Sequence, residues 1–444
     1  MKRRFGVGIV LLLLIAIFLS DLPVEIKKGL SVLSVAAGFW IFEVLPLPVT
    51  SLLIPVLSVL LGIVSVKSVF TAFAHPLIFL FFGGFALATA LTKYGLDKFI
   101  AYKIVSLSKG SLLLTSTLLF TATAFISMWI SNTSTTAMML PLALGILGAV
   151  GAGNRLKSFL LLGIAYSASI GGIGTIVGSP PNGITAANLG IDFTEWMRFG
   201  LPTVILLLPL MFAVMFLYFR PELKGNIAFE KIPFPKERGS LSVLGVFILT
   251  VALWLFGKKI ALLFGIHKYF DAVVAVLAVI LLFALKLVSW EEIERGTDWG
   301  TLMLFGGGIS LSYILKVSNT SKFIANAFVS SVGFLPSLLL VLSVTAFMIF
   351  MTELMSNTAT AAIFIPILIA AAKEMGLPPQ ELAIPAGIAA SCAFMLPVAT
   401  PPNAIVYGTG EIKQSDMIKV GLIMNLTFSL SISLLCYFII NGLL

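Results

Sequence analysis

Two apolar stretches of about forty residues, 111–150 and 333–372, restrict the possible fold more than any other feature of this chain. The first contains no charged residue and the second contains Glu353 alone. A continuous helix of forty residues would be about 60 Å long, roughly twice the hydrocarbon thickness of a bilayer. Each stretch must therefore fold back, either as two full spans with a turn outside or as a re-entrant hairpin that enters and leaves on one side.

The two stretches carry the same polar phrase near their middle. SNTSTTAMMLP occupies 131–141 and SNTATAAIFIP occupies 356–366, 225 positions further on. Hydroxyl and amide side chains are costly in hydrocarbon unless something binds them, and backbone that turns at depth needs protein or water around it. The polar tips therefore favour re-entrant hairpins, and we expect both tips to form one small-ion site near the middle of a membrane.

The composition is that of a membrane protein with many spans. Hydrophobic residues make up 59% of the 444 residues, charged residues 11%, and the mean hydropathy is +1.11, far outside the range of soluble domains. The basic residues that give the net charge of +9 lie in short loops, so they indicate the topology and not a nucleic-acid partner. The apolar N-terminus has no signal-peptide cleavage site before Asp21 and is expected to be an uncleaved first helix. Cys392 and Cys436 lie in apolar segments and are expected to be buried thiols.

Runs of spanning length predict an all-α polytopic membrane protein of about eleven transmembrane helices plus two re-entrant hairpins. The runs lie near 5–20, 29–46, 48–66, 74–92, 159–177, 200–219, 241–257, 270–289, 299–316, 383–396 and 418–442.

Further motifs extend the duplication to both halves of the chain. FGG at 82–84 corresponds to 305–307, GIAYS at 163–167 to GIAAS at 387–391, GSPPN at 178–182 to ATPPN at 399–403, and WMRFG at 196–200 to MIKVG at 417–421. The charged, Pro-rich segment 220–239 is predicted to be the linker. Such a duplication, with interrupted helices in both copies, is typical of secondary transporters whose site lies between inverted repeats.

The basic residues give the orientation. With five spans per repeat the two halves have opposite orientations, and 18 of the 28 Lys and Arg then lie in the cytoplasm. This predicts an inner-membrane protein with a cytoplasmic N-terminus and an extracytoplasmic C-terminus. The first hairpin would open to the cytoplasm and the second to the exterior.

Proline pairs mark where helices break beside the tips. Pro180-Pro181 and Pro401-Pro402 cannot continue a helix, so the helices that start near Phe159 and Glu381 should be discontinuous, each break facing a Ser-Asn-Thr tip. By motif spacing the second break is about three residues shorter than the first. Helix N-termini there would favour an anion, and freed carbonyls an alkali cation. Because no Lys or Arg lies in these segments, neutral donors and co-bound cations would hold the anion.

These motifs resemble the divalent anion/sodium symporter family, the INDY-type dicarboxylate transporters, over nearly the whole chain. The resemblance implies a homodimer in which a scaffold domain holds the dimer and a transport domain moves as an elevator. It divides the chain into 1–110 (first helix and scaffold part of repeat 1), 111–219 (transport part of repeat 1), 220–240 (cytoplasmic linker), 241–332 (scaffold part of repeat 2) and 333–444 (transport part of repeat 2). It implies co-transported sodium ions, no organic cofactor, and C4-dicarboxylates such as succinate, malate or fumarate as substrates.

The resemblance also implies site residues. The first sodium site would use Ser127, Ile130, Ser131, Asn132 and Gly178, and the second Thr352, Met355, Asn357 and Ala399. The substrate would meet Asn132, Thr133, Ser179, Asn357, Thr358, Thr400 and Pro401. Independently, Ser127 and Thr352 each precede the motif serine by four residues, which on a continuous helix places them on the same face.

Other readings of the sequence remain open. Glu353 is either a proton carrier or, as we favour, a structural acceptor, because Met128 takes its place in the first copy. The chain could be a sodium-independent dicarboxylate exchanger, a citrate or sulfate carrier on the same fold, or a passive anion channel. A membrane enzyme acting on lipid-linked substrates would need clustered acidic ligands or a His/Ser/Asp set, and neither appears in the sequence.

Overall fold

The protein is helical throughout the residues described by the computed structural model, which are 2–223 and 233–443. The first half consists of α1 (Lys2–Leu19), α2 (Val24–Ile41), α3 (Leu47–Leu60), α4 (Val66–Phe70), α5 (Pro76–Lys93), α6 (Leu96–Ser106), α7 (Leu112–Ser127), α8 (Asn132–Ala149), α9 (Asn154–Gly172), α10 (Pro180–Leu189) and α11 (Phe193–Phe219). The second half consists of α12 (Ser240–Leu263), α13 (Phe270–Ala284), α14 (Trp290–Gly296), α15 (Trp299–Val317), α16 (Thr320–Val332), α17 (Ser337–Leu354), α18 (Asn357–Glu374), α19 (Pro379–Ala389), α20 (Pro401–Tyr407) and α21 (Gln414–Leu443). Much of the predicted linker, at 224–232, lies outside the described residues.

Six helical segments of the described chain are long and apolar enough to cross a membrane. They are Val66–Lys93, Phe193–Phe219, Ser240–Leu263, Trp299–Val317, Ser337–Leu354 and Gln414–Gly442, and the shorter helices α3, α7 and α13 are also apolar. The all-helical, multi-pass class is confirmed. The count of eleven spans and the re-entrance of the hairpins stay predictions.

One group of helices pairs across the duplication. α3 of the first half packs on α15 of the second, and α13 of the second half packs on α5 of the first. Both contacts use a glycine: a Cβ on Gly83 would lie 2.6 Å from the carbonyl oxygen of Ala275, and one on Gly307 would lie 2.8 Å from Cα of Ser51. Only glycine allows so close an approach.

These contacts correct the register of the repeat in this region. Gly83 and Gly307 make equivalent contacts in the two halves, which gives an offset of 224 between the halves (307 − 83). The sequence match of the two FGG motifs gives 223 (305 − 82). The rings of Phe81 and Phe305, which have the same offset of 224 (305 − 81), lie 4.5 Å apart between their centroids. Runs of glycine allow either register in the sequence, and packing selects one.

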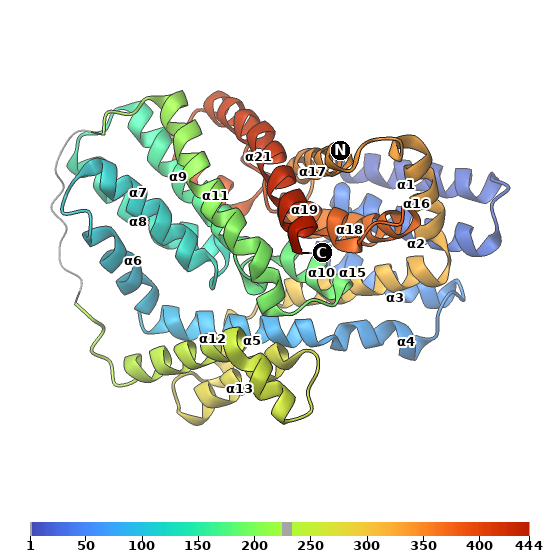
Figure 1. The fold of residues 1–444 in the computed structure, drawn as a ribbon, viewed down its shortest axis with the longest axis horizontal. Coiled ribbons are helices and arrows are strands. Elements are labelled where there is room, and N and C mark those ends of the chain that lie inside the picture. Colours follow the sequence, from blue (N-terminus) through green and yellow to red (C-terminus); the bar gives the residue numbers. More distant parts are fainter. Residues whose placement is uncertain (1, 224–232, 444) are drawn as a thin grey trace.

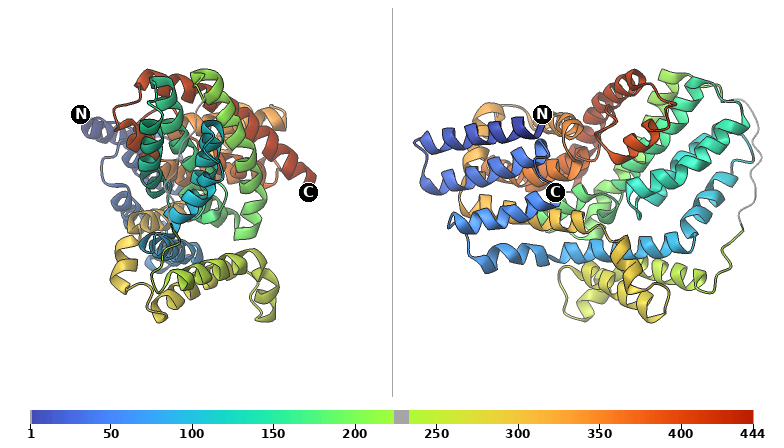
Figure 2. Two further views of the ribbon diagram at one scale, coloured as in Figure 1. Left: turned by 90° about the vertical axis from the view of Figure 1, so that its left-hand side faces the viewer. Right: turned by 180° about the vertical axis from the view of Figure 1, so that it is seen from behind.

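A second group of helices surrounds α9. α7, α8 and α11 pack against it, α17 and α19 pack on α21, and α10 of one half packs on α18 of the other. From Ser158 to Gly172 every residue of α9 is buried. α7, α8, α9 and α11 lie together at one end of the molecule and α1, α2 and α3 at the other, as the front and rear views agree (Figure 1, Figure 2).

The predicted helix breaks are present in both halves. α9 ends at Gly172 and α10 starts at Pro180, with a short 3-10 turn between them, while α19 ends at Ala389 and α20 starts at Pro401. In each case the two prolines occupy the first positions of the new helix, which lack an intrahelical acceptor for an N–H. The second break is the longer one, contrary to the motif spacing, because α19 ends early and side chains from other helices hold the backbone that follows.

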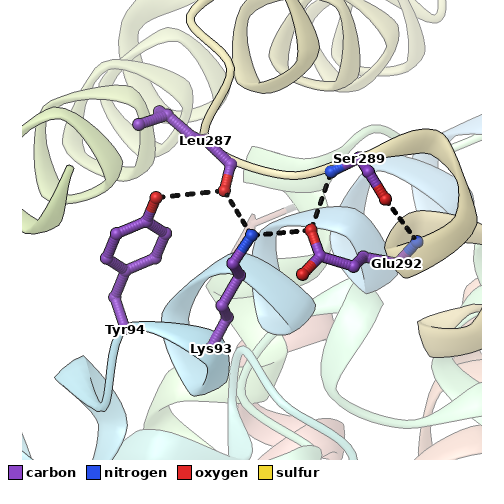
Figure 3. Close-up of polar contacts among 5 residues, drawn as sticks. All are labelled: Lys93, Tyr94, Leu287, Ser289 and Glu292. Carbon is purple, nitrogen blue, oxygen red and sulfur yellow. Dashed lines mark hydrogen bonds and ion pairs between the residues drawn. The ribbon is translucent and has the colours of Figure 1, made fainter.

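A cluster of polar contacts joins the C-terminal end of α5 to the start of α14 (Figure 3). Lys93 Nζ lies 2.7 Å from Glu292 Oε2 and 3.0 Å from the carbonyl oxygen of Leu287, to which the hydroxyl of Tyr94 also donates at 3.1 Å. Ser289 caps α14, and Glu292 accepts the Ser289 N–H in return. The α13–α14 loop is thus tied to α5.

Candidate binding site at the hairpin tips

Both hairpin tips and both helix breaks line one cavity of about 700 Å³. Another part of the wall belongs to α3, α5, α15 and the loop before α3, and includes Pro48, Phe81, Phe85 and Leu304. All seven residues predicted to meet the substrate line this cavity: Asn132, Thr133, Ser179, Asn357, Thr358, Thr400 and Pro401. The structure therefore brings together two motifs that lie 225 positions apart in the chain (356 − 131).

The first tip is closed by a side-chain hydrogen bond. α7 ends at Ser127 and α8 begins at Asn132, and the Ser127 hydroxyl lies 2.7 Å from Asn132 Oδ1. The expectation that Ser127 and Ser131 share one helical face is wrong, because the chain leaves the helix between them. Ser127 instead turns back onto the first residue of the next helix.

Oxygen atoms crowd around the amide of Asn132. Facing Ser127 with Oδ1, the amide oxygen lies among acceptors only; turned over, Nδ2 donates to the carbonyls of Ala168 at 3.1 Å and Gly178 at 3.3 Å and to the Ser127 hydroxyl at 2.7 Å. In the turned orientation the amide satisfies all three oxygens, and oxygens of this kind are also the ligands that hard cations prefer. A Cβ on Gly172 would lie 2.5 Å from Asn132 Oδ1, so a glycine is needed there.

The second tip repeats this arrangement with a threonine. The Thr352 hydroxyl lies 2.7 Å from Asn357 Oδ1 and 2.9 Å from the carbonyl oxygen of Ala390. A hydroxyl has one proton and can donate to only one of the two at a time. Thr352 is fully buried, so the second tip also has more acceptors than protons to satisfy them.

The remaining residues of the predicted sodium sites lie around the two tips. Gly178, Met355 and Ala399 line the cavity, and Ile130 is buried behind the first tip. The Ser131 hydroxyl caps α8 by accepting the Ser134 N–H at 3.2 Å. Of the substrate residues, Thr400 caps α20 by accepting the Asn403 N–H at 3.3 Å, and the Ser179 hydroxyl lies 3.0 Å from that of Ser391.

Two asparagines that the sequence analysis did not assign hold the helix breaks. Asn182 Nδ2 donates to the carbonyls of Gly172 and Thr175, ten and seven residues before it, at 2.8 and 2.7 Å. Asn403 Nδ2 donates to the carbonyls of Ala393 and Leu396, again ten and seven residues before it, at 3.0 and 3.1 Å. The third letter of the repeated Pro-Pro-Asn motif was the signal, and its role is to satisfy carbonyls that a broken helix leaves free.

Glu353 is an acceptor for the second break, as the sequence analysis favoured. The backbone N–H groups of Phe394, Met395 and Leu396 donate to its carboxylate at 2.6, 2.9 and 3.2 Å. The Asn425 amide on α21 adds a fourth bond at 2.9 Å. These bonds take up backbone groups that would otherwise continue α19, which explains why that helix ends early.

The charges around the cavity suit a cation more than a bare anion. No Lys, Arg or His of the described chain lines it, whereas the carboxylates of Glu43, Asp298 and Glu353 do. Five helices of ten or more residues, α3, α8, α10, α15 and α18, begin at its wall, and the N-terminus of a helix favours an anion. The arrangement can hold an anion on neutral donors when cations sit at the tips. Within the described ranges there is no group of three or more His, Cys, Asp or Glu side chains that could hold a metal ion.

Comparison with known proteins gives a family profile and relatives that span nearly the whole chain. The profile described as "Sodium:sulfate symporter transmembrane region" matches residues 4–440. An uncharacterized transporter of Haemophilus influenzae is 48% identical over 97% of this chain and 96% of its own length, and one of Methanocaldococcus jannaschii is 42% identical over 98% of each. The sodium-dependent dicarboxylate transporter SdcS of Staphylococcus saprophyticus is 34% identical over 94% of this chain and 87% of its own.

A solved structure has a similar fold. The YdaH transporter of Alcanivorax borkumensis superimposes with a TM-score of 0.60 over 85% of this chain and 87% of its own, at 15% identity. At that identity the likeness concerns the arrangement of helices alone.

Proposed function

Since the chain belongs to the sodium:sulfate symporter family and is a sodium-coupled anion transporter of the membrane, not an enzyme, we propose that it carries C4-dicarboxylates such as succinate, malate or fumarate together with sodium. The observation that carries this proposal is the matched pair of tips in one cavity. Ser127 with Asn132, and Thr352 with Asn357, each place a hydroxyl 2.7 Å from a side-chain amide.

The oxygen atoms gathered at each tip support a sodium ion there. Alkali and alkaline-earth cations are bound by neutral and charged oxygen ligands. We assign the first ion to Ser127, Asn132 and the backbone near Ile130, Ser131 and Gly178, and the second to Thr352, Asn357 and the backbone near Met355 and Ala399. At the second tip a sodium ion would also satisfy the acceptor that the single proton of Thr352 leaves free.

The anion would lie between the two tips. Its carboxylates would accept from Asn132, Thr133, Asn357 and Thr358 at the starts of α8 and α18, with Ser179, Thr400 and Pro401 beside them. Because the cavity has carboxylates and lacks basic side chains in the described chain, a dianion would enter with little affinity until sodium is bound. This supports coupled symport over passive conduction.

The substrate is tested by uptake into proteoliposomes. Labelled succinate, malate, fumarate, citrate and sulfate are compared with an inward sodium gradient, with choline in place of sodium, and with internal succinate alone. We expect accumulation of the C4 acids only with sodium. Uptake driven by internal succinate without sodium would identify an exchanger, preference for sulfate or citrate would change the substrate, and a failure to accumulate would indicate a channel.

The site is tested by Asn132→Ala and Asn357→Ala. Each should abolish sodium-dependent succinate uptake while the protein remains folded, and Asn188→Ala, a change in an asparagine of α10 whose Nδ2 donates to the carbonyl of Ile184, should not. Near-normal uptake by both tip variants would reject the assignment.

We propose further that alternating access is an elevator movement of the helices around α9 within a homodimer. Trp129 at the first tip stacks on Trp254 of α12, with ring centroids 6.5 Å apart, and this contact joins the expected transport and scaffold parts. Cysteines at these two positions, in a chain whose buried Cys392 and Cys436 are replaced, should stop uptake when cross-linked by a short bis-thiol reagent. Full uptake by the cross-linked protein would exclude the movement.

A further inference from the structure

The two hairpin tips differ in one buried charge. Glu353 is 4% exposed and stands next to Thr352, whereas the equivalent position of the first tip, 225 residues earlier (353 − 128), is Met128. The side chains of the first tip and first break that line the cavity carry no carboxylate: Trp129, Ser131, Asn132, Thr133, Val177, Gly178, Ser179 and Pro180.

All four groups bonded to Glu353 are donors. Phe394 and Met395 N–H and the Asn425 amide donate to Oε1, and Leu396 N–H donates to Oε2. An ionised carboxylate is acceptor-only and matches this set, whereas the proton of a neutral carboxyl would find no acceptor among these four groups. Three successive backbone N–H groups form the kind of concave nest that binds anions, and here a side chain of the protein itself fills it.

The backbone that Glu353 holds is bonded to two other side chains as well. The hydroxyl of Tyr166, which is fully buried in α9, donates to the carbonyl of Phe394 at 2.7 Å. Asn403 holds the carbonyls of Ala393 and Leu396. This clamped segment lies between Ala390, whose carbonyl faces Thr352 at 2.9 Å, and Ala399 on the cavity wall.

The first break is held without any charge. Thr175 donates its hydroxyl proton to the carbonyl of Met128 at 2.6 Å, and Trp196 Nε1 donates to the carbonyl of Ile173 at 2.9 Å. Both ties use neutral groups. The repeats therefore solve the same structural problem in two ways, and only the second leaves a negative charge beside the cation ligands.

We propose that Glu353 is a positioning residue that makes the second cation site the stronger of the two, so that it fills first. This rests on the proposed function, since it concerns the sodium sites assigned there. The carboxylate fixes the carbonyls around Thr352 through the clamped segment, and its charge offsets part of the cost of bringing a cation into a buried place. The first site has only neutral oxygens and would fill afterwards.

The test compares sodium binding in wild type, Glu353→Gln and Glu381→Gln. Glu381, in the first turn of α19, is also 4% exposed but does not line the cavity, so it is a control for the loss of a carboxylate away from the cavity. The thermal midpoint of the purified protein is followed against sodium concentration without anion, and uptake is followed against sodium at saturating succinate. Glu353→Gln keeps the shape of the side chain and removes its charge.

We expect Glu353→Gln to raise the half-saturating sodium concentration roughly tenfold in both measurements, the size expected for a hydrogen-bonded charge. At saturating sodium its KM for succinate should stay within about twofold of wild type. Glu381→Gln should leave both unchanged. Unchanged sodium dependence in Glu353→Gln, or an equal change in Glu381→Gln, would overturn the proposal.

A second variant covers the case in which Glu353→Gln does not fold. Tyr166→Phe removes the hydrogen bond to the carbonyl of Phe394 and keeps the carboxylate, and it should raise the half-saturating sodium concentration by a smaller factor. Wild-type sodium dependence in Tyr166→Phe would then reject the clamp. If wild type itself gains no thermal stability from sodium, the proposed function fails, and this outcome is distinct from failure of the inference about Glu353.

Discussion

The hydroxyl of Ser179 lies 3.0 Å from the hydroxyl of Ser391, and this hydrogen bond joins the helix break of one repeat to that of the other. Both side chains are almost completely buried. Ser179 is the residue before Pro180 at the cavity wall, whereas Ser391 follows the end of α19. The two halves of the proposed site thus contact each other directly.

We predict that these two serines act as a unit in anion binding. Ser179→Ala and Ser391→Ala should each raise the KM for the anion several-fold, since a buried hydroxyl loses its partner. The double variant should be little worse than either single one, with a coupling of about 1 kcal/mol in a double-mutant cycle. Ser167→Ala is the control, because Ser167 aligns with Ser391 but faces Met211 Sδ at 3.8 Å. Strictly additive effects would show that the bond does not matter for binding.

A second prediction concerns the asparagines of the two Pro-Pro-Asn motifs. Asn182→Asp and Asn403→Asp replace an amide donor by a carboxylate oxygen that faces two carbonyls, so each should lower the free energy of unfolding by about 3 kcal/mol or more. Uptake would fall because the fold is weakened, which separates these variants from Asn132→Ala and Asn357→Ala. The measurement is the thermal midpoint in detergent. Asn188→Asp, at a half-buried position near the end of α10, should change it far less.

Sequence reasoning predicted the parts of the site that depend on side-chain type. The repeated Ser-Asn-Thr phrase, the proline pairs and the two apolar stretches of forty residues led to the two tips and the two breaks, and the family resemblance supplied the seven substrate residues that line the cavity. Each of these is a local signal: a polar group without charge in an apolar run, or a residue that cannot continue a helix.

The parts of the fold and site that sequence reasoning missed depend on contacts between distant residues. The carbonyls of Ala168 and Ala390 face the tips, and a backbone carbonyl leaves no mark in residue type. The length of the second break depends on Glu353, which lies 41 positions before Phe394 (394 − 353) and binds its N–H. The register of the glycine motifs was wrong by one residue because it is selected by two contacts between distant helices, Gly83 with Ala275 and Gly307 with Ser51.

A third prediction concerns the tie between α5 and α14 at low pH. The hydrogen bond from Lys93 and that from the Ser289 N–H lower the pKa of Glu292 below its ordinary value of 4.5. The stability that the Glu292 carboxylate contributes is therefore fully present above about pH 4.5, and it is lost as the pH falls through the lowered pKa. Glu292→Gln should lower the thermal midpoint slightly above that pH, since exposed ion pairs contribute little. The difference from wild type should vanish at lower pH, and a difference that persists there would contradict the assignment.

A fourth prediction tests how close the first hairpin must lie to α9. A Cβ on Gly171 would overlap the backbone of Ala124 in α7, and neither helix backbone can yield without moving the tip that carries Ser127. Gly171→Ala should therefore lower the free energy of unfolding by about 1 to 3 kcal/mol, the cost of overpacking. It should also raise the half-saturating sodium concentration, because the distance from Ser127 to the carbonyls of α9 changes.

Gly148→Ala in α8 is the control: its Cβ meets no neighbouring atom within 4 Å, and it should be neutral or stabilising by up to about 1 kcal/mol. Both effects are read from thermal midpoints and sodium titrations of the two variants, and equal behaviour of the two would show that the contact of α7 with α9 does not position the tip.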